Sequence, residues 1–288
     1  MPTNHRPVKV VVDSAADIPQ ELAQQLDITV IPLRVHIGGK TYLDGVNISG
    51  EDFYRELEAT RSVTTTSLPA LDSLEDAYRR LTRDGFDVVS VHMSSKLSGT
   101  YNAALMASTG DDVITDAVAV VDTRTISMSE GWCAIVAAEA ARDGKSLEEV
   151  TNIAEEAATR AILFGALETL EYVIKSGRVS RLPGTVGTVL SIKPILTTLP
   201  NGEAAIIERV RTRKKVLERI TELTAALGPL DRIAVMHGAD PEGAQQLIEL
   251  LEAINPPKPI VVGHIGAVLG THIGPGGVGV CCLKASAR

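Results

Sequence analysis

Hydroxyl-bearing residues gather in two short stretches of this chain where the oxygen atoms of a ligand could be bound. The first stretch runs Thr64-Thr65-Thr66-Ser67, and the second runs Ser94-Ser95-Lys96-Leu97-Ser98-Gly99-Thr100. The second stretch follows an apolar segment, Val88–Met93, that predicts a buried strand, and it precedes a predicted helix. Open α/β sheets bind ligands at the carboxyl ends of their strands, and the start of a helix there leaves N–H groups free for an anion. These residues therefore predict an anion-binding loop, although a hydroxyl at a helix start also serves as an ordinary N-cap.

A histidine and an arginine are two further candidates. His272 lies in a segment with glycines at 270, 274, 276 and 277, which we expect to form a sharp turn that presents this side chain into a pocket. A lone histidine is more commonly a packing residue. Arg178 follows Gly177 at the end of a predicted helix, where a cation is favoured by the helix dipole alone.

Composition limits the class of protein. The 288 residues are 44% hydrophobic and 22% charged, as in globular proteins, and the formal net charge of -8 argues against broad nucleic-acid binding. No apolar run approaches the roughly 18 residues of a membrane-spanning helix, and the first residues lack a signal-peptide core. We therefore expect a cytoplasmic protein. The three cysteines have no zinc-site spacing, so we expect no metal.

Strands and helices alternate in the first half of the chain. The predicted strands are Val8–Val12, Val88–Met93 and Ala117–Val121, and the predicted helices are Pro19–Leu26, a segment from Ser49 through Leu57, Leu71–Leu81 and a segment from Ser146 through Ala158. Between them, Ile28–Ile37 alternates up to a Gly38-Gly39 turn and predicts one arm of a hairpin. Alternating strands and helices indicate a parallel sheet with flanking helices.

The pattern changes after about residue 162. Ile192–Leu199 and Ala204–Val210 flank Asn201-Gly202, which is a strong hairpin signal. The remaining predicted elements are a helix at Arg213–Leu227, strands at Ile233–Met236, Ile260–Gly263 and Val278–Leu283, and a helix at Pro241–Ala253. The sequence thus predicts an α/β protein of two domains, an N-terminal α/β domain (1–161) and a C-terminal α+β domain with a mixed sheet (162–288), with the ligand site between them.

The order of these motifs resembles the DegV family, also called FakB, of bacterial fatty-acid-binding proteins. The matching segments are Asp13-Ser14-Ala15-Ala16-Asp17, Thr66-Ser67-Leu68-Pro69, Ser94-Ser95-Lys96-Leu97-Ser98-Gly99-Thr100, Val121-Asp122-Thr123, Lys175-Ser176-Gly177-Arg178 and Thr271-His272 with its following glycines. Each motif alone is weak, but their order and spacing extend over nearly the whole chain. The resemblance implies a two-domain DegV-type fold with a lipid tunnel between the domains.

The resemblance also implies roles for particular residues. Thr66, Ser98 and His272 would bind the carboxyl group of a long-chain fatty acid, and Arg178 would lie near that group or support it. A separate fatty acid kinase would then convert the presented carboxyl group to an acyl phosphate for phospholipid synthesis. On this interpretation the chain is not itself an enzyme and requires no cofactor.

One basic cluster stands out in the acidic chain. It comprises Arg209, Arg211, Arg213, Lys214 and Lys215. A solvated helix start is the simpler interpretation, and a docking surface for a kinase or an anionic membrane is the alternative. In the family, the position that matches Arg211 is tied to partner docking.

Two other functions stay open at this stage. Ser98 and His272 could serve a hydrolase or acyltransferase, although the chain has no Gly-x-Ser-x-Gly nucleophile motif and no recognisable orienting acid. A phosphate- or sugar-binding domain related to dihydroxyacetone kinase is the second alternative, and it would need more cationic groups near these loops.

Overall fold

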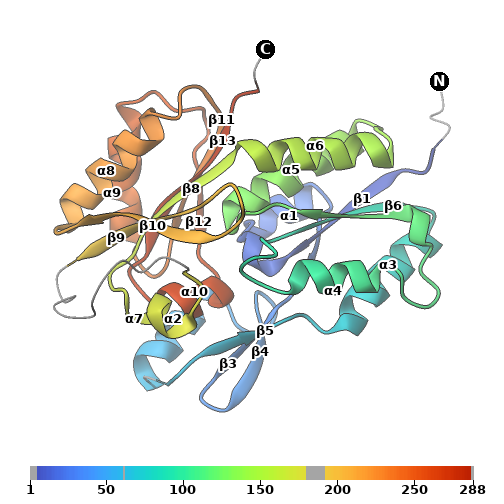
Figure 1. Cartoon of the computed structure of the whole chain (residues 1–288), viewed down its shortest axis with the longest axis horizontal. Coiled ribbons are helices and arrows are strands. Elements are labelled where there is room, and N and C mark those ends of the chain that lie inside the picture. Colours follow the sequence, from blue (N-terminus) through green and yellow to red (C-terminus); the bar gives the residue numbers. More distant parts are fainter. Residues whose placement is uncertain (1–4, 61, 180–191, 287–288) are drawn as a thin grey trace.

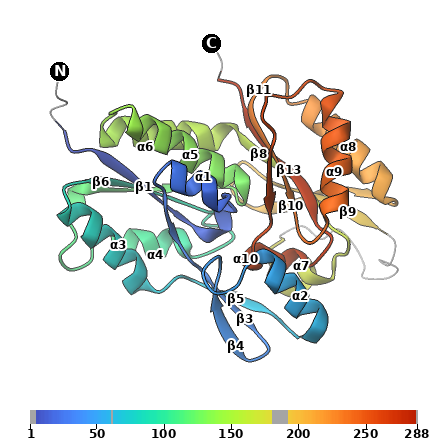
Figure 2. The same cartoon turned by 180° about the vertical axis from the view of Figure 1, so that it is seen from behind.

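The computed structural model describes residues 5–60, 62–179 and 192–286, and these form two main sheets with helices packed around and between them (Figure 1). The N-terminal sheet and its helices lie on one side of the molecule and the C-terminal sheet on the other, as the view from behind also shows (Figure 2). In the described residues there is no helix long and apolar enough to cross a membrane.

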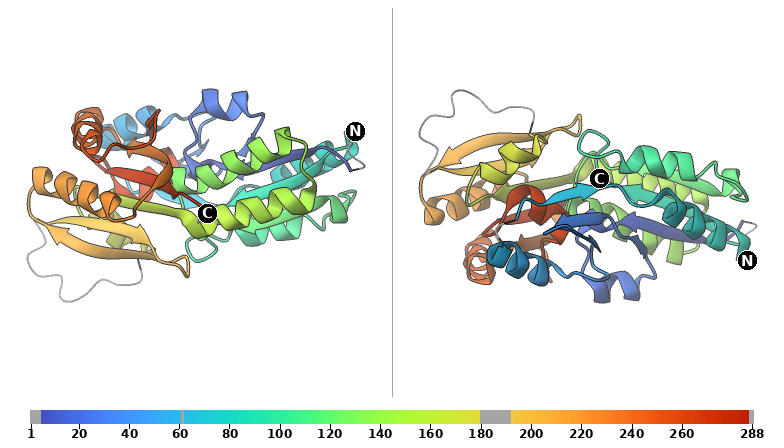
Figure 3. Two further views of the ribbon diagram at one scale, coloured as in Figure 1. Left: turned by 90° about the horizontal axis from the view of Figure 1, so that it is seen from above. Right: turned by 90° about the horizontal axis from the view of Figure 1, so that it is seen from below.

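The first sheet is parallel and has the strand order β2-β1-β6-β7. Its strands are β1 (Val8–Asp13), β2 (Thr29–Ile31), β6 (Asp87–His92) and β7 (Val118–Asp122). Strand β1 is almost entirely valine because both of its faces are buried: Val10 and Val12 belong to one apolar cluster and Val11 to another. Helices α5 and α6 pack on one face, while α3 and α4 cover the other (Figure 3).

The helices of this half are α1 (Gln20–Gln25), α2 (Gly50–Thr60), α3 (Leu71–Arg83), α4 (Thr100–Ala107), α5 (Met128–Arg142) and α6 (Leu147–Arg160). Helices α1, α2, α3 and α6 begin and end close to the predicted positions, whereas no bounds were predicted for α4 and α5. Ser146 and Glu149 form the expected capping box at the start of α6, with each side chain accepting a hydrogen bond from the other residue's backbone N–H.

The second sheet is mixed and has the strand order β10-β9-β8-β13-β11-β12. Its strands are β8 (Ala161–Ala166), β9 (Lys193–Thr198), β10 (Ala204–Val210), β11 (Leu230–His237), β12 (Val261–His264) and β13 (Val278–Lys284). The antiparallel pair β9–β10 confirms the hairpin predicted at Asn201-Gly202. Helices α8 (Arg213–Ala225) and α9 (Pro241–Glu252) pack on the outer face of the sheet.

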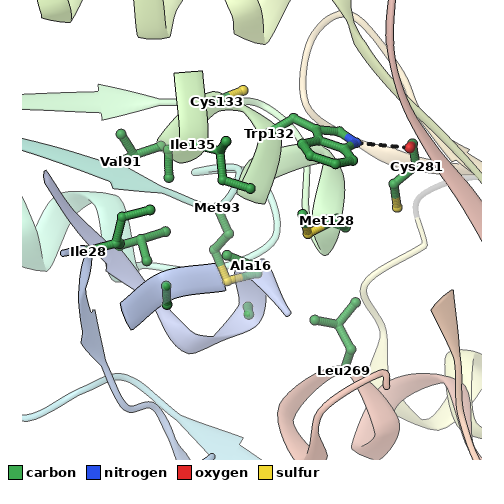
Figure 4. Close-up of a cluster of buried hydrophobic side chains, with 14 of the residues drawn as sticks. Ala16, Ile28, Val91, Met93, Met128, Trp132, Cys133, Ile135, Leu269 and Cys281 are labelled. Carbon is green, nitrogen blue, oxygen red and sulfur yellow. Dashed lines mark hydrogen bonds between the residues drawn. The ribbon is translucent and has the colours of Figure 1, made fainter. Parts of the chain in front are cut away.

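Helix α5 joins the two halves into one apolar core. Eleven of its residues are buried, and it contacts β1 and β6 of the first sheet as well as β8 and β13 of the second. Figure 4 shows Trp132 of this helix reaching the second sheet, where its indole N–H donates to the carbonyl of Cys281 at 3.0 Å. The junction between the halves is therefore packed like a domain interior.

A smaller unit completes the junction. It consists of a three-stranded antiparallel sheet of β4 (Lys40–Leu43), β3 (Arg34–Ile37) and β5 (Thr65–Ser67), and of the short helices α7 (Glu171–Ser176) and α10 (Ala267–Ile273). Helix α10 packs against α2, α7 and β3, so it lies where the N- and C-terminal halves of the sequence meet (Figure 1).

Two local predictions are wrong in extent or place. The hairpin at Gly38-Gly39 is confirmed by the antiparallel pairing of β3 with β4. Its first arm is shorter than Ile28–Ile37, because the chain leaves the parallel sheet at Pro32 and Leu33 and enters the small sheet as β3. His272 does not lie in a turn, since residues 267–273 form α10 and the sharp bend begins at Gly274, whose φ is +74°. The division into 1–161 and 162–288 stays a prediction.

Candidate functional site

The loop after β6 is held in place by hydrogen bonds at both of its sides. Asp13 Oδ2 accepts from the backbone N–H of Met93, and Asp122 Oδ1 accepts from that of Ser95. Ser94 donates its hydroxyl proton to the carbonyl of Gly202 in the other half of the molecule, at 2.7 Å. The Ser94–Thr100 loop is therefore a fixed part of the junction.

A cavity of about 520 Å³ opens beside this loop and is lined by both halves of the chain. Such a volume is typical of small-molecule sites. Four of the predicted site residues, Thr66, Ser98, Arg178 and His272, line this one cavity although they come from four separate elements or loops. Arg211 does not line it.

Thr66 and His272 are in direct contact within this wall. Thr66 Oγ1 on β5 and His272 Nε2 on α10 are 2.9 Å apart and hydrogen-bonded. His272 Nδ1 is buried and has no hydrogen-bond partner among the described residues. Burial, and secondly the charge of Arg178, lower the pKa of His272 to about 4, so the ring is neutral at pH 7. A neutral imidazole has one donor and one acceptor, which leaves the ring able to bind a further polar atom.

Ser98 also lines the cavity and lies two residues before the start of α4. Its Oγ is 2.8 Å from Thr100 Oγ1 and accepts from the backbone N–H of Thr100 at 3.3 Å. The N-cap residue of α4 is Gly99, which has no side chain and therefore makes no side-chain capping hydrogen bond. A Cβ on Gly99 would make ordinary van der Waals contact with the Leu68 side chain, at 3.4 Å, so packing does not require glycine at this position.

Two buried carboxylates from the N-terminal half fix the start of α10. Asp17 Oδ1 accepts from the N–H of Gly266 at 2.8 Å, and Asp44 Oδ1 accepts from that of Ala267 at 3.0 Å. These bonds satisfy donors that a helix start leaves unpaired. Burial raises the pKa of Asp17 to about 8 and that of Asp44 to about 6, against the effect of their hydrogen bonds. Asp17 belongs to the motif noted in the sequence, and its structural task is to hold the helix that carries His272.

Arg178 is exposed and follows Gly177, which ends α7 in the left-handed conformation. Its guanidinium donates to the carbonyl of Ser176 at 2.6 Å. Thr66, Ser176, Arg178 and His272 also line a second, outer groove of about 790 Å³ on the far side of the same wall. The polar end of the cavity is thus adjacent to a groove at the surface.

The basic cluster does not act as one unit. Arg213 pairs with Asp240 and donates to the carbonyl of Gly276, so it stabilises the fold around α9. Arg211, Lys214 and Lys215 are exposed at the start of α8. Among the residues that the structure describes, no group of three or more His, Cys, Asp or Glu side chains could hold a metal ion.

Sequence reasoning missed most of the cavity wall. The apolar part of the lining consists of Leu33, Leu68, Met93, Leu97, Ile126, Val173, Val179, Leu196, Ala204, Val268, Leu269 and Ile273. These are ordinary strand, loop and helix residues, and nothing in their types distinguishes a cavity wall from a solid core. Only Leu68, Met93, Leu97 and Ile273 lie inside short stretches that the sequence singled out.

The family model described as "Uncharacterised protein, DegV family" matches residues 7–285. The chain belongs to the DegV family. A DegV domain-containing protein of Streptomyces coelicolor is 36% identical over 280 residues, which cover 96% of this chain and 98% of that protein. Protein DegV of Bacillus subtilis is 34% identical over 282 residues, with 96% and 99% of the two chains covered.

Solved structures of the DegV family have the same fold. A DegV family protein from Thermus thermophilus, described by its fatty acid binding, superposes with a TM-score of 0.88 at 30% identity and covers 97% of this chain and 100% of its own. DegV from Bacillus subtilis, described as a fatty acid binding protein, superposes with a TM-score of 0.85 at 33% identity, again over 97% and 100%. The two-sheet α/β architecture expected from the resemblance is confirmed.

Proposed function

We propose that this protein binds one long-chain fatty acid, with the acyl chain in the cavity between the two sheets and the carboxyl group at Thr66, Ser98 and His272. The observation that carries the proposal is the composition of the 520 Å³ cavity, whose lining combines polar residues that include Thr66, Ser98 and His272 with twelve apolar residues. The fatty-acid-binding structures of the same family support it.

The physical chemistry of the cavity fits such a ligand. Burying about fifteen methylenes at ~0.8 kcal/mol each gives on the order of 12 kcal/mol before the costs of ordering the chain. Hydrogen bonds to a charged head group contribute roughly 1.5–3 kcal/mol each. On this account the acyl chain sets the affinity, while the hydroxyls and His272 set the orientation. Arg178, at the rim, adds a positive charge near the carboxylate.

We further propose that the bound carboxyl group is presented to a separate fatty acid kinase, and that this chain alone turns over no substrate. Thr66, Arg178 and His272 line the outer groove as well as the cavity, which supports access to the head group from the surface. The hydrogen bonds do not form the relay of a hydrolase: Ser98 pairs with Thr100, and His272 pairs with Thr66. The docking role of Arg211 is part of this proposal and is supported by its exposure.

Mass spectrometry of an organic extract of the purified protein tests the binding proposal. We expect one equivalent of fatty acid from the expression host, and added palmitate or oleate should load a delipidated sample to the same level. A folded protein that repeatedly yields no fatty acid and does not bind the added acids would rule out the carrier function.

A further inference from the structure

A second, smaller cavity extends the head-group cavity toward the C-terminal sheet. It has a volume of about 80 Å³. It shares five wall residues with the larger cavity: Ile126, Leu196, Ala204, Leu269 and Ile273. None of the four polar residues discussed above, Thr66, Ser98, Arg178 and His272, lines it. The smaller cavity therefore lies beyond the apolar part of the larger one, away from the polar wall.

Two glycines on adjacent strands lie in the floor of this smaller cavity. Gly165 on β8 is paired with Gly279 on β13. Their neighbours show which way they face. Leu163 and Cys281 belong to the apolar cluster between the two halves, whereas Phe164 and Val280 belong to the cluster beneath α8 and α9. Because side chains alternate along a strand, positions 165 and 279 face the junction between the halves.

The two glycines differ in what a side chain would meet. A Cβ on Gly279 would lie 2.6 Å from the carbonyl oxygen of Phe164, so close packing of the strands requires glycine there. A Cβ on Gly165 would have no atom within 4 Å, and the backbone of Gly165 is not in the left-handed region. Neither packing nor backbone conformation requires glycine at 165, although glycine weakens a strand interior. The absence of a side chain at position 165 therefore keeps space open in the smaller cavity.

We propose that Gly165 determines which fatty acids fit, by leaving open the slot that receives the methyl end of a long acyl chain. This inference rests on the proposed fatty-acid binding and adds to it a residue that sets the upper limit of chain length. A side chain at position 165 would occupy the slot. Chains that reach the slot would then bind less tightly, and shorter chains that end before it would bind as before.

The test is a binding profile of saturated fatty acids from dodecanoate to octadecanoate on delipidated wild type, Gly165→Ala and Gly165→Val. We expect the affinity for octadecanoate to fall by about tenfold for every two methylenes displaced, more in the valine variant than in the alanine variant. Affinity for dodecanoate should stay within about threefold of the wild-type value. The melting temperature of the delipidated alanine variant should be equal to or higher than that of the wild type, because a strand glycine is replaced where a Cβ has room.

Ala166→Val is the matched control. Ala166 also borders the smaller cavity, but its side chain is packed in the cluster beneath α8 and α9, so the variant adds volume on the same strand in that cluster. This control should lower the melting temperature and leave the chain-length profile unchanged. An unchanged profile in Gly165→Val, or an equal loss for all chain lengths, would overturn the inference while leaving fatty-acid binding intact. A wild type that binds none of the acids would instead refute the proposed function itself.

Discussion

At the scale of single residues, the cavity combines neutral hydrogen-bonding groups with a charge at its rim. Thr66 and Ser98 supply hydroxyls, and His272 is a neutral ring because burial lowers its pKa to about 4. Arg178 and Lys96 are exposed cations that line the same cavity. Neutral donors cost less to desolvate than charged ones, and the hydrogen bonds that they donate offset the cost of desolvating a carboxylate.

Fatty-acid binding should raise the pKa of His272 above about 4. An adjacent carboxylate favours the charged imidazolium, so the loaded protein holds its proton to higher pH than the apo protein does. Between pH 4 and 6.5, binding should therefore be accompanied by proton uptake at this ring. Titration of the His272 ring signals by NMR, with and without palmitate, measures both pKa values. Identical curves for the two forms would mean that the carboxylate is not bound at His272.

Removing one head-group contact should impair phosphoryl transfer more than binding. Ser98→Ala deletes one hydrogen bond, worth about 0.5–3 kcal/mol, so the affinity should fall by about two- to 150-fold and saturating fatty acid should still load the variant. Transfer requires a precise position of the carboxylate oxygen, and a small misplacement costs roughly a hundredfold in rate. Lipid occupancy and acyl-phosphate formation with a cognate kinase should be measured on the same samples. If Ser98→Ala, Thr66→Ala and His272→Ala all keep the full rate of phosphorylation, the head group is bound elsewhere.

At the scale of elements, α10 depends on the N-terminal half for its position. Its first N–H groups are bound by Asp17 and Asp44, and its last turn carries His272. Through these two carboxylates, the loops that follow β1 and β4 fix one side of the head-group site. A displacement of either loop would move His272 relative to Thr66.

The two capping carboxylates should make the protein less stable as pH rises from 4 to 8. The pKa of Asp44 is raised to about 6 and that of Asp17 to about 8 in the folded state. Through most of this range the unfolded chain has released both protons, while the folded protein still holds them at low pH and releases them as pH rises. The free energy of unfolding therefore falls with increasing pH. Asp44→Asn should remove at most about 3 kcal/mol of this change. Denaturant unfolding at pH 4, 6 and 8 measures it, with the exposed Asp52→Asn as the control; a variant as pH-dependent as the wild type would contradict the assignment.

The elements also show what the sequence could predict. Strands such as Val88–Met93 and the Asn201-Gly202 hairpin were predictable because buried valines and turn glycines carry local signals. Helix α10 was missed because it is short and rich in glycine, and its start depends on Asp17 and Asp44, which lie more than 200 residues away. The polar side of the site was likewise predictable from hydroxyl motifs. Its apolar wall was not, since Leu196 or Val268 looks the same in a cavity as in a core.

At the scale of the whole molecule, the ligand would lie between two halves that already share a core through α5. The charged cluster at the start of α8 is separate from this junction. Arg213 is engaged with Asp240, which leaves Arg211 and its exposed neighbours as the candidate docking surface.

Arg211→Ala should therefore bind fatty acid normally but support slower acyl-phosphate formation with a cognate kinase. Charges at the rim of an interface mainly alter association, so the defect should be largest at low kinase concentration and should diminish at high salt. Arg80→Ala, which removes an exposed cation on α3 outside this cluster, is the control for a general loss of positive charge. Equal rates for the wild type and Arg211→Ala would remove Arg211 from the docking surface.

The central claim is that a single fatty acid lies with its carboxyl group at Thr66, Ser98 and His272 and its chain between the sheets. A crystal structure of the delipidated protein reloaded with 16-bromohexadecanoic acid tests it most directly, because anomalous scattering locates the bromine at the end of the chain. We predict a carboxylate within about 3 Å of Thr66, Ser98 and His272, and a bromine peak beside Gly165. A bromine peak at the Thr66–His272 pair, or a cavity without ligand density after loading, would contradict the account.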